Sequence, residues 1–593
     1  MSYTFINFKG GVMEKLKTDV LVVGAGPSGL TAAVALATQG IKVLAISKYP
    51  GTAPAPRAHI TNQRTMEAFR DFGIEDAIRE IGYDLSFLSY NVIATSLAGM
   101  EIGRYRSYGT PPDRLSEYAL ASPSPAINCQ QHVMEPVLLG EARKRGADVR
   151  FNNELLSIQQ TPDEIIAVVL DRETGKEYEV RAPYAIGADG GRSTVAEQLD
   201  FKFVGEAGLK GMASSWIEAD VTKYTSYRPG ILYWMSLPGY DRGTGTASWT
   251  CVKPFTEWLL VHPWEGGNGE KPSEGEVMER ARLTLGDASI PIRVKHISTW
   301  QVNNVVATEY QKGRVFLAGD AAHRHPPYGG LGTNTSIQDA FGLAWKLAFV
   351  LKGQAGTSLL ASHTEERQPV GAHVVHRAIE SFKNMGPLMD ALGLKDGQTE
   401  EEGLASLREL FSGDSRGTER RERLAAAIKL QDYRSNALGV DLGQRYTSKA
   451  IIAESIPFPE PDGDPELHYR PTTHPGAYIP HAWVEHERKQ LSTLDLAGHG
   501  RFCLIIGAGG EPWVHAARQA STHLGIELPV FSVGLRCEYD DVTCDWAKVR
   551  EIGDGGAILV RPDRFIAWRS MDLPESPIEA LDTALRHVLS IQR

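Results

Sequence analysis

Three glycine-rich segments, each directly after a run of apolar residues, constrain the fold of this chain more than any other feature. They are VLVVGAGPSGL at 20–30, IGADGGRST at 186–194 and VFLAGDAAH at 315–323. A short apolar run followed by glycine is typical of a buried strand that ends in a tight turn. Each pattern alone predicts little more than a turn, so the three are interpreted together.

The first segment has the strand–turn–helix–strand context of a dinucleotide-binding fold. Gly24, Gly26 and Gly29 have GxGxxG spacing after the strand DVLVV, and the helical run LTAAVALATQG and the strand IKVLAIS follow. In this fingerprint the first glycine permits the turn, the second admits a pyrophosphate to the helix N-terminus, and the third lets the helix pack on the strand. The acidic residue that usually binds the ribose is absent, since Ser47 and Lys48 end the second strand. A glycine turn without a ligand is the alternative.

The other two segments each place an aspartate beside glycine at a strand end. Asp189 and Asp320 can accept hydrogen bonds from ribose or ribityl hydroxyls there. A plain turn would explain either segment on its own. It does not explain why both occur in a chain that also contains GxGxxG. A fourth glycine cluster, LIIGAGGEPW at 504–513, has Pro512 at the third fingerprint position and is interpreted as a turn. We therefore predict one dinucleotide fold, so that a nicotinamide cofactor would have no Rossmann domain of its own.

The composition excludes several classes of protein. The chain has 593 residues, enough for several domains, and its net charge of −11 argues against a broad nucleic-acid or anionic-membrane surface. Five cysteines without CxxC spacing favour reduced thiols over a disulfide framework. No signal peptide is visible, and no apolar run approaches the roughly 20 residues of a membrane helix. We expect a soluble cytoplasmic protein that binds neither nucleic acid nor membrane.

Together, the three segments resemble the motifs of the single-component, class A flavoprotein aromatic hydroxylases. VGAGPSGL is similar to their FAD fingerprint, IGADGGRS to their DG motif and FLAGDAAH to their GD motif. The strings PRAHITNQRTMEAFRDFGIE, LAGDAAHRHPPYGGLGTNTSIQDAF and HPGAYIPHAWV resemble the phenol hydroxylase branch, which includes 2,4-dichlorophenol 6-monooxygenase and 2-hydroxybiphenyl 3-monooxygenase. The resemblance extends over nearly the whole chain. It implies bound FAD, with NADH or NADPH and O2 as co-substrates.

The resemblance also assigns parts of the flavin site to individual residues. Asp320 would hold the ribityl chain, Arg57 would contact the phosphate or ribityl side, and Gln131 the adenosine side. N–H groups at the start of the helix TNTSIQDAFGLAWKLAFVL would face the pyrimidine edge of the isoalloxazine, where reduced flavin is anionic. The residues concerned are Gly332, Thr333 and Asn334, the last two near the helix cap, with Pro327 beside the flavin face.

Hydroxylation of a phenol needs a base, because a free phenol has a pKa of about 10. We predict that His59, two residues after Arg57, is that base, since histidine suits proton transfer near neutral pH. The resemblance assigns the same role to the histidine of the matching PRxHI string, and a packed or capping histidine is the alternative. His323 and His325 form an HxH pair without a third ligand, so no metal is expected. The lack of a G-x-S-x-G string argues against a serine hydrolase.

The wall of the substrate pocket is expected from residues outside the flavin fold. RPGILYWMSLPG predicts a strand with Tyr233 and Trp234 on opposite faces, so that one would line the pocket and the other would lie in the core. Asn128 stands where the resemblance leads us to expect an aspartate, and Thr250 stands near the place of an expected arginine. The polar part of the pocket therefore differs from that of the relatives.

These patterns predict an α/β protein of several parts. A Rossmann-like FAD-binding domain would span 15–375, interleaved with β-sheet substrate segments at about 86–125 and 206–299. A helical region and a Pro-rich linker would follow over 376–465. The remainder, 466–593, resembles the thioredoxin-like C-terminal domain of phenol hydroxylases but lacks the CxxC of a dithiol site. We predict a structural or dimer-contact role for it, and a homodimer.

The favoured interpretation is an NAD(P)H-dependent FAD monooxygenase. As the resemblance implies, it would insert one oxygen atom of O2 into a phenolic ring, ortho to the hydroxyl, through a C4a-hydroperoxyflavin. Asn128 and Thr250 motivate a second interpretation, the epoxidation, N-hydroxylation or decarboxylative hydroxylation of a natural-product intermediate. A flavin-binding regulatory protein without activity is the third. The substrate and the choice between NADH and NADPH stay open.

Overall fold

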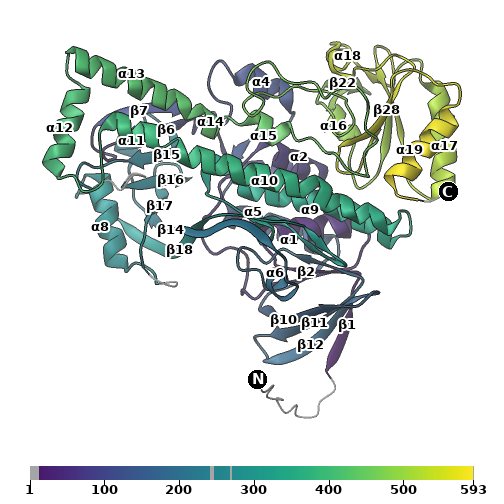
Figure 1. Ribbon diagram of the computed structural model, residues 1–593, viewed down its shortest axis with the longest axis horizontal. Coiled ribbons are helices and arrows are strands. Elements are labelled where there is room, and N and C mark those ends of the chain that lie inside the picture. Colours follow the sequence, from purple (N-terminus) through teal and green to yellow (C-terminus); the bar gives the residue numbers. More distant parts are fainter. Residues whose placement is uncertain (1–12, 241–245, 267–269, 592–593) are drawn as a thin grey trace.

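The structure, a computed structural model, describes residues 13–240, 246–266 and 270–591 (Figure 1). Most of the N-terminal segment on which the signal-peptide prediction rests, residues 1–12, lies outside this range. The chain builds layers of sheet and helix, and a C-terminal α/β unit lies beside the ends of the long helices α9 and α10 (yellow in Figure 1).

A six-stranded sheet forms the dinucleotide fold. Its strand order is β19-β20-β13-β2-β3-β9, in which every neighbouring pair is parallel except β19 with β20. The strands are β2 (Val20–Val23), β3 (Val43–Ile46), β9 (Asp148–Arg150), β13 (Tyr184–Gly187), β19 (Gln311–Lys312) and β20 (Val315–Leu317). The strands that precede the three glycine-rich segments, β20, β13 and β2, are direct neighbours. Because they are parallel, all three segments leave the sheet at the same edge, and the predicted Rossmann-like fold is confirmed.

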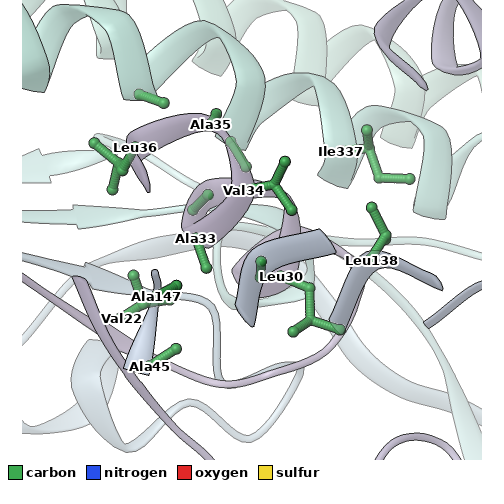
Figure 2. Close-up of a cluster of buried hydrophobic side chains, with 14 of the residues drawn as sticks. Val22, Leu30, Ala33, Val34, Ala35, Leu36, Ala45, Leu138, Ala147 and Ile337 are labelled. Atoms are coloured by element: carbon green, nitrogen blue, oxygen red, sulfur yellow. The ribbon is translucent and has the colours of Figure 1, made fainter. Parts of the chain in front are cut away.

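Three helices cover one face of this sheet. They are α1 (Pro27–Thr38), α5 (Gln131–Lys144) and α9 (Gly332–Leu351). Figure 2 shows the shared core, in which Leu30 of α1 lies with Leu138 of α5 and Ile337 of α9, all of them fully buried. Burial of one such side chain stabilises the fold by about 1.5–3 kcal/mol. The core therefore fixes the N-termini of α1 and α9 near the glycine-rich edge of the sheet.

A four-stranded sheet covers the opposite face. Its order is β1-β12-β11-β10, with β1 (Glu14–Lys17), β10 (Asn153–Gln160), β11 (Ile165–Asp171) and β12 (Lys176–Ala182). Alternate residues of β11, among them Ala167 and Val169, pack against Leu21 and Val23 of β2. The strands of the dinucleotide sheet are thus buried on both faces, which explains why their sequences are continuously apolar.

An eight-stranded sheet forms the second large layer. Its order is β21-β18-β14-β17-β16-β15-β6-β7. The strands are β6 (Tyr90–Ala94), β7 (Glu101–Arg106), β14 (Phe203–Glu218), β15 (Gly230–Met235), β16 (Ala247–Lys253), β17 (Glu257–Pro263), β18 (Arg293–Ala307) and β21 (His323–Arg324). Both predicted substrate segments contribute strands to it. The sheet extends beyond the predicted end at residue 299, because β18 runs to Ala307 and also pairs with β21. The exact domain limits stay a prediction.

A helical region links this layer to the C-terminal unit. It contains α10 (Ser362–Lys383), α11 (Gly386–Leu392), α12 (Glu400–Leu410), α13 (Ser415–Leu430), α14 (Asp432–Ser435) and α15 (Leu438–Leu442). Helices α11, α12 and α13 share a buried core with Ile93 of β6 and Ile102 of β7. The region therefore covers the outer end of the eight-stranded sheet.

The C-terminal unit has the strand order of a thioredoxin-like fold. Its sheet runs β23-β22-β26-β25-β24-β27-β28. Its elements include β24 (Cys503–Ile506), α17 (Glu511–Leu524), β25 (Val530–Gly534), β27 (Ala557–Val560), β28 (Ile566–Ser570) and α19 (Pro577–Val588). A parallel β24–α17–β25 unit is followed by the antiparallel pair β27–β28 and α19. LIIGAGGEPW is the turn between β24 and α17, as predicted.

Buried charges join this unit to the flavin-fold helices. Arg561 donates to both oxygens of Glu366 on α10, at 2.6 and 2.9 Å, and Lys346 on α9 donates to Glu366 Oε2 at 2.6 Å. Arg561 also pairs with Asp563, and all four side chains are almost fully buried. Since each charge faces an opposite one, the cluster offsets its own desolvation. The C-terminal unit is therefore an integral part of the fold.

The described residues contain no candidate membrane helix and no candidate metal cluster. In residues 13–240, 246–266 and 270–591, no helix is long and apolar enough to cross a membrane. No group of three or more metal-ligating side chains occurs in the same ranges. The five cysteines are free, and Cys544 alone among them is exposed.

Replacement of Arg561 by methionine tests the buried charge cluster. Arg561→Met leaves Asp563 without its partner and removes two hydrogen bonds from Glu366, so we expect the free energy of unfolding to fall by about 3–5 kcal/mol. Urea denaturation and limited proteolysis of the C-terminal unit measure the effect. Arg423→Met, which removes the exposed Arg423–Glu419 pair, is the matched control and should change stability by less than about 1 kcal/mol. Equal losses in the two variants would contradict the cluster's role.

Candidate functional site

The three glycine-rich segments converge because two of their glycines permit close backbone contacts. A Cβ added to Gly24, which has a φ of +110°, would lie 2.1 Å from the carbonyl oxygen of Ala188. A Cβ on Gly319 would lie 2.9 Å from Ser336 Oγ and 3.3 Å from Ser28 Cβ. The first segment thus touches the second through Gly24, and the third touches α1 and α9 through Gly319.

The other two fingerprint glycines have different surroundings. A Cβ on Gly29 would lie 1.9 Å from the carbonyl oxygen of Gly24, so Gly29 is required for the packing of α1 on its strand. A Cβ on Gly26 would meet nothing closer than Glu135 Oε1 at 4.0 Å. Gly26 is also the N-cap of α1 and makes no side-chain cap. Open space before free helix N–H groups fits a pyrophosphate, as predicted for this glycine.

Asp320 lies among three basic side chains. It is exposed, at the end of β20, yet desolvation by the surrounding protein raises its pKa, and the charges of His323, Arg324 and Arg57 partly offset that rise. Arg57 is exposed as well. The charge of Arg57 therefore acts on Asp320, and both side chains are exposed; their predicted contacts with the cofactor stay a prediction.

Arg324 was missed by the sequence reasoning. Its guanidinium donates to the carbonyl oxygen of Gly191, so it ties the GD segment to the DG segment. Its Nε is buried without a hydrogen-bond partner among the described residues. No local sequence pattern indicated this role, because the hydrogen bond joins two residues that are 133 positions apart in the sequence.

Asp189 uses its carboxylate within its own turn. Oδ1 accepts from Ser193 Oγ at 2.5 Å, and Oδ2 accepts from Val195 N at 3.1 Å. These bonds fix the turn before α6 (Thr194–Gln198) directly beside Gly24. The predicted contact of Asp189 with a ribose or ribityl hydroxyl stays a prediction, and what the structure adds is a role in shaping the turn.

Gln131 and Glu135 form a polar pair on the first turns of α5. Gln131 Nε2 donates to Glu135 Oε1 at 2.6 Å, and Ala53 N donates to Glu135 Oε2 at 2.5 Å. Burial raises the pKa of Glu135. Glu135 is also the residue nearest to a Cβ on Gly26, so its bond with Gln131 places that side chain near the same glycine. The buried Glu135, which the sequence reasoning missed, is the acidic group nearest to that open space.

The start of α9 differs in detail from the prediction. The N-cap is Leu331, and no side chain caps the helix, whereas Thr333 or Asn334 was expected near the cap. The side chain of Asn334 instead donates to the carbonyl oxygens of Ile60 and Gly330, at 2.9 and 2.6 Å. The N–H groups of Gly332 and Thr333 are thereby left for a ligand, because the first N–H groups of a helix have no partner within it. Pro327 is exposed just before this turn.

The two histidines of the HxH pair have separate partners. His323 Nε2 lies 2.8 Å from Asp339 Oδ2, which also accepts from Gly319 N at 3.0 Å. His325 Nδ1 lies 2.7 Å from the carbonyl oxygen of Pro326. Asp339 on α9 therefore positions the GD segment through His323 and Gly319.

His59 lies directly before the first strand of a small three-stranded sheet. Its strands are β4 (Ile60–Thr61), β8 (Ile127–Asn128) and β5 (Tyr83–Asp84), in the order β4-β8-β5. The carbonyl oxygen of His59 accepts from Cys129 N at 2.8 Å, and that of Ile60 accepts from Asn334 Nδ2. The backbone around His59 is therefore fixed against the start of α9.

The imidazole of His59 is half-buried and close to an uncharged partner. His59 Nδ1 lies 3.2 Å from Asn128 Oδ1. Burial lowers the pKa of His59 to about 4, and the hydrogen bond to Asn128 only partly offsets this. His59 is thus neutral at pH 7 and able to accept a proton. Thr250 precedes Cys251 on β16, and the carbonyl oxygen of Cys251 accepts from Gln130 Nε2 at 2.8 Å; a place for Thr250 in the pocket stays a prediction.

The two aromatic residues of β15 lie on opposite faces, as the alternation predicted. Tyr233 is fully buried; its hydroxyl donates to the carbonyl oxygen of Arg228 at 2.7 Å and accepts from Gly230 N. Tyr233 is therefore the core residue of the pair. Trp234 is stacked on Tyr328, and the Arg434 guanidinium lies 4.4 and 4.8 Å from their two ring centroids. Trp234 and Tyr328 both pack against the core that helices α11, α12 and α13 share with the sheet. Because Tyr328 follows Pro327, a place for Trp234 in the pocket wall stays a prediction.

Comparison with known proteins shows which family this chain belongs to. A family model described as "FAD binding domain" matches residues 17–378, and one described as "Aromatic-ring hydroxylase, C-terminal" matches 472–590. The chain belongs to the FAD-dependent aromatic-ring hydroxylases. FAD is its cofactor, and this hydroxylase consumes NAD(P)H and O2. The open space at Gly26 and the exposed Asp320 and Arg57 fit this cofactor.

Relatives of the hydroxylase match it over nearly their whole length. A 2,4-dichlorophenol 6-monooxygenase of Delftia acidovorans is 43% identical over 99% of this chain and 100% of the relative. A phenol 2-monooxygenase of Pseudomonas sp. (strain EST1001) is 40% identical over 97% and 93%. Among solved structures, the flavin-dependent monooxygenase PieE in complex with FAD and substrate is 40% identical with a TM-score of 0.94, over 97% of this chain and 100% of that one. These findings confirm the resemblance to the phenol hydroxylase branch.

Alanine at two fingerprint glycines separates folding from cofactor binding. Gly26→Ala adds a methyl group to open space at a φ of −86°, which any residue adopts. We expect its apoprotein to unfold like the wild type while FAD affinity falls at least tenfold. Gly24→Ala forces a Cβ against Ala188 at a positive φ, so it should lower the stability of the apoprotein too, by several kcal/mol. Thermal unfolding and flavin fluorescence titration measure both effects. A Gly26→Ala protein that binds FAD normally would contradict the predicted pyrophosphate site.

Proposed function

We propose that this hydroxylase inserts one oxygen atom into the ring of a small phenol, at the carbon ortho to the hydroxyl. The observation that carries the proposal is the position of His59. A neutral imidazole lies on a backbone segment that Asn334 ties to the start of α9, where the flavin ring is expected. The names of two relatives, a 2,4-dichlorophenol 6-monooxygenase and a phenol 2-monooxygenase, support the same substrate class.

The cofactor would be held by groups from all three glycine-rich segments. Gly26 and the N-terminus of α1 would bind the pyrophosphate, Gln131 the adenosine side, and Asp320 with Arg57 the ribityl and phosphate side. The N–H groups of Gly332 and Thr333 would face the pyrimidine edge of the isoalloxazine. When bound, FAD takes electrons from NAD(P)H and activates O2 for transfer to the ring.

His59 would prepare the substrate for that transfer. Its Nε2 would accept the phenolic proton, because Nδ1 is engaged with Asn128. Loss of this proton makes the ring carbon ortho to the oxygen more nucleophilic. Trp234, with Tyr328 stacked on it, would form an apolar wall of the pocket, and Asn128 and Thr250 would supply the polar end. We also propose that the protein forms a homodimer and is located in the cytoplasm.

A panel of phenols tests the proposed reaction. NAD(P)H oxidation should rise at least tenfold when a small phenol is added, and the product should be the matching catechol. A flavin-binding regulatory protein would show no stimulation. A natural-product monooxygenase would be stimulated by polycyclic aromatics and not by simple phenols. Spectrophotometry at 340 nm with product analysis by mass spectrometry distinguishes the three interpretations.

Replacement of His59 by alanine tests the base. His59→Ala should lower the rate of hydroxylation by about 10²–10⁴-fold, because the imidazole is the group proposed to accept the phenolic proton. FAD affinity should change by less than about threefold, since the imidazole does not form part of the expected pyrophosphate or ribityl sites. Single-turnover kinetics and flavin titration measure the two quantities. Full hydroxylation by this variant would remove His59 from the mechanism.

A further inference from the structure

Three hydrogen bonds form a chain behind His59. Gln130 Nε2 donates to the carbonyl oxygen of Cys251 at 2.8 Å and to Asn128 Oδ1 at 3.4 Å, and Asn128 Oδ1 lies 3.2 Å from His59 Nδ1. Asn128 is 0% exposed and Gln130 is 3% exposed. The other ends of the two amides, Asn128 Nδ2 and Gln130 Oε1, have no hydrogen-bond partner among the described residues. The bonds of this chain therefore set the orientation of both amides.

The direction of every bond in the chain follows from the group at its end. A backbone carbonyl oxygen only accepts hydrogen bonds, so Gln130 must turn its NH2 group toward Cys251. The same NH2 group faces Asn128, which must therefore present its oxygen. That oxygen can only accept from His59, so the imidazole proton lies on Nδ1 and Nε2 keeps its lone pair. A reversed Asn128 would place two NH2 groups face to face in a buried site.

These hydrogen-bonded amides place no negative charge beside His59. Burial lowers the pKa of His59 and Asn128 opposes that effect, and no ionised side chain among the described residues contributes. On the strands around it, Tyr83 lies opposite Asn128, and burial raises the pKa of Tyr83 and of the thiols of Cys129 and Cys251. These groups are neutral at pH 7. An imidazolium formed at His59 is therefore supported by an amide and not by a carboxylate.

We propose that Gln130 and Asn128 are positioning residues that fix His59 in the Nδ1–H tautomer, and that the uncharged amide of Asn128 leaves His59 a weaker base than a carboxylate partner would. This inference rests on the proposed function. In the step concerned, the phenolic O–H bond breaks and an N–H bond forms at His59 Nε2, and the proton later leaves to solvent. Because Asn128 carries no charge, the imidazolium formed in this step is stabilised less than it would be beside a carboxylate.

Replacement of Asn128 by aspartate tests the charge. Asn128→Asp keeps an oxygen for both His59 and Gln130 but adds a negative charge beside the imidazole. We expect the acid limb of the kcat/KM profile to move up by about one to three pH units. The kcat/KM of the variant should exceed that of the wild type for phenols with pKa values of about 7 to 10, because a stronger base takes up more of the phenolic proton. An unmoved acid limb together with an unchanged kcat/KM would overturn the inference.

Replacement of Gln130 by methionine tests the tautomer. Gln130→Met removes the donor that orients Asn128, so the amide can reverse and His59 should populate both tautomers, with hydroxylation falling about tenfold or more. Nitrogen-15 NMR of histidine-labelled protein reports the protonated ring nitrogen, and the spectrum of His59→Gln assigns the signal. Gln431→Met is the matched control, because Gln431 is also fully buried and donates to two backbone carbonyls, those of Asn384 and Ala427, in the helical region. It should leave the His59 signal unchanged.

The outcomes separate this inference from the proposed function. A wild type that hydroxylates phenols but shows His59 protonated at Nε2 contradicts the inference alone. A wild type that hydroxylates no phenol contradicts the proposed function, while the NMR signal still tests the hydrogen-bond chain.

Discussion

The close approach of Gly24 to the carbonyl of Ala188 is the constraint on which the arrangement of the site depends. A side chain at Gly24 would collide with that carbonyl at 2.1 Å, so the ends of β2 and β13 lie as near to each other as their backbones allow. Gly319 makes a similarly close contact with Ser28 of α1 and Ser336 of α9. Three segments separated by more than a hundred residues each thereby line one space at the edge of the sheet, and the N-termini of α1 and α9 open into it.

Backbone and side-chain bonds together position His59. Its carbonyl oxygen accepts from Cys129 N, its neighbour Ile60 accepts from the Asn334 side chain, and its imidazole lies against Asn128. The proposed base is thereby linked to the start of α9. The buried cluster of Lys346, Glu366 and Arg561 braces α9 and α10 from the opposite side. This gives the C-terminal unit, which has no dithiol site, a physical role in the rigidity of the flavin fold.

Much of the cofactor site could be predicted because its motifs are contiguous in the sequence. The glycines of the first segment and the strand before each motif are local patterns, and their order led to the fold. The use of Asp189 in its own turn, the absence of a side-chain cap at Leu331 and the core position of Tyr233 depend on bond geometry that composition does not specify. Arg324, Glu135 and Arg561 were missed for another reason. Their partners lie far away in the sequence, 195 residues in the case of Arg561 and Glu366, and no local pattern signals such a pair.

We propose that this flavin-dependent hydroxylase transfers an oxygen atom from O2 to a phenolic ring. Turnover of a small phenol with NAD(P)H under ¹⁸O2, followed by mass spectrometry of the product, is the decisive experiment. We expect a catechol that contains one ¹⁸O atom, in an amount matching the NAD(P)H consumed, with no label from H2¹⁸O. Consumption of NAD(P)H with the phenol recovered unchanged, or a product whose new oxygen comes from water, would contradict it.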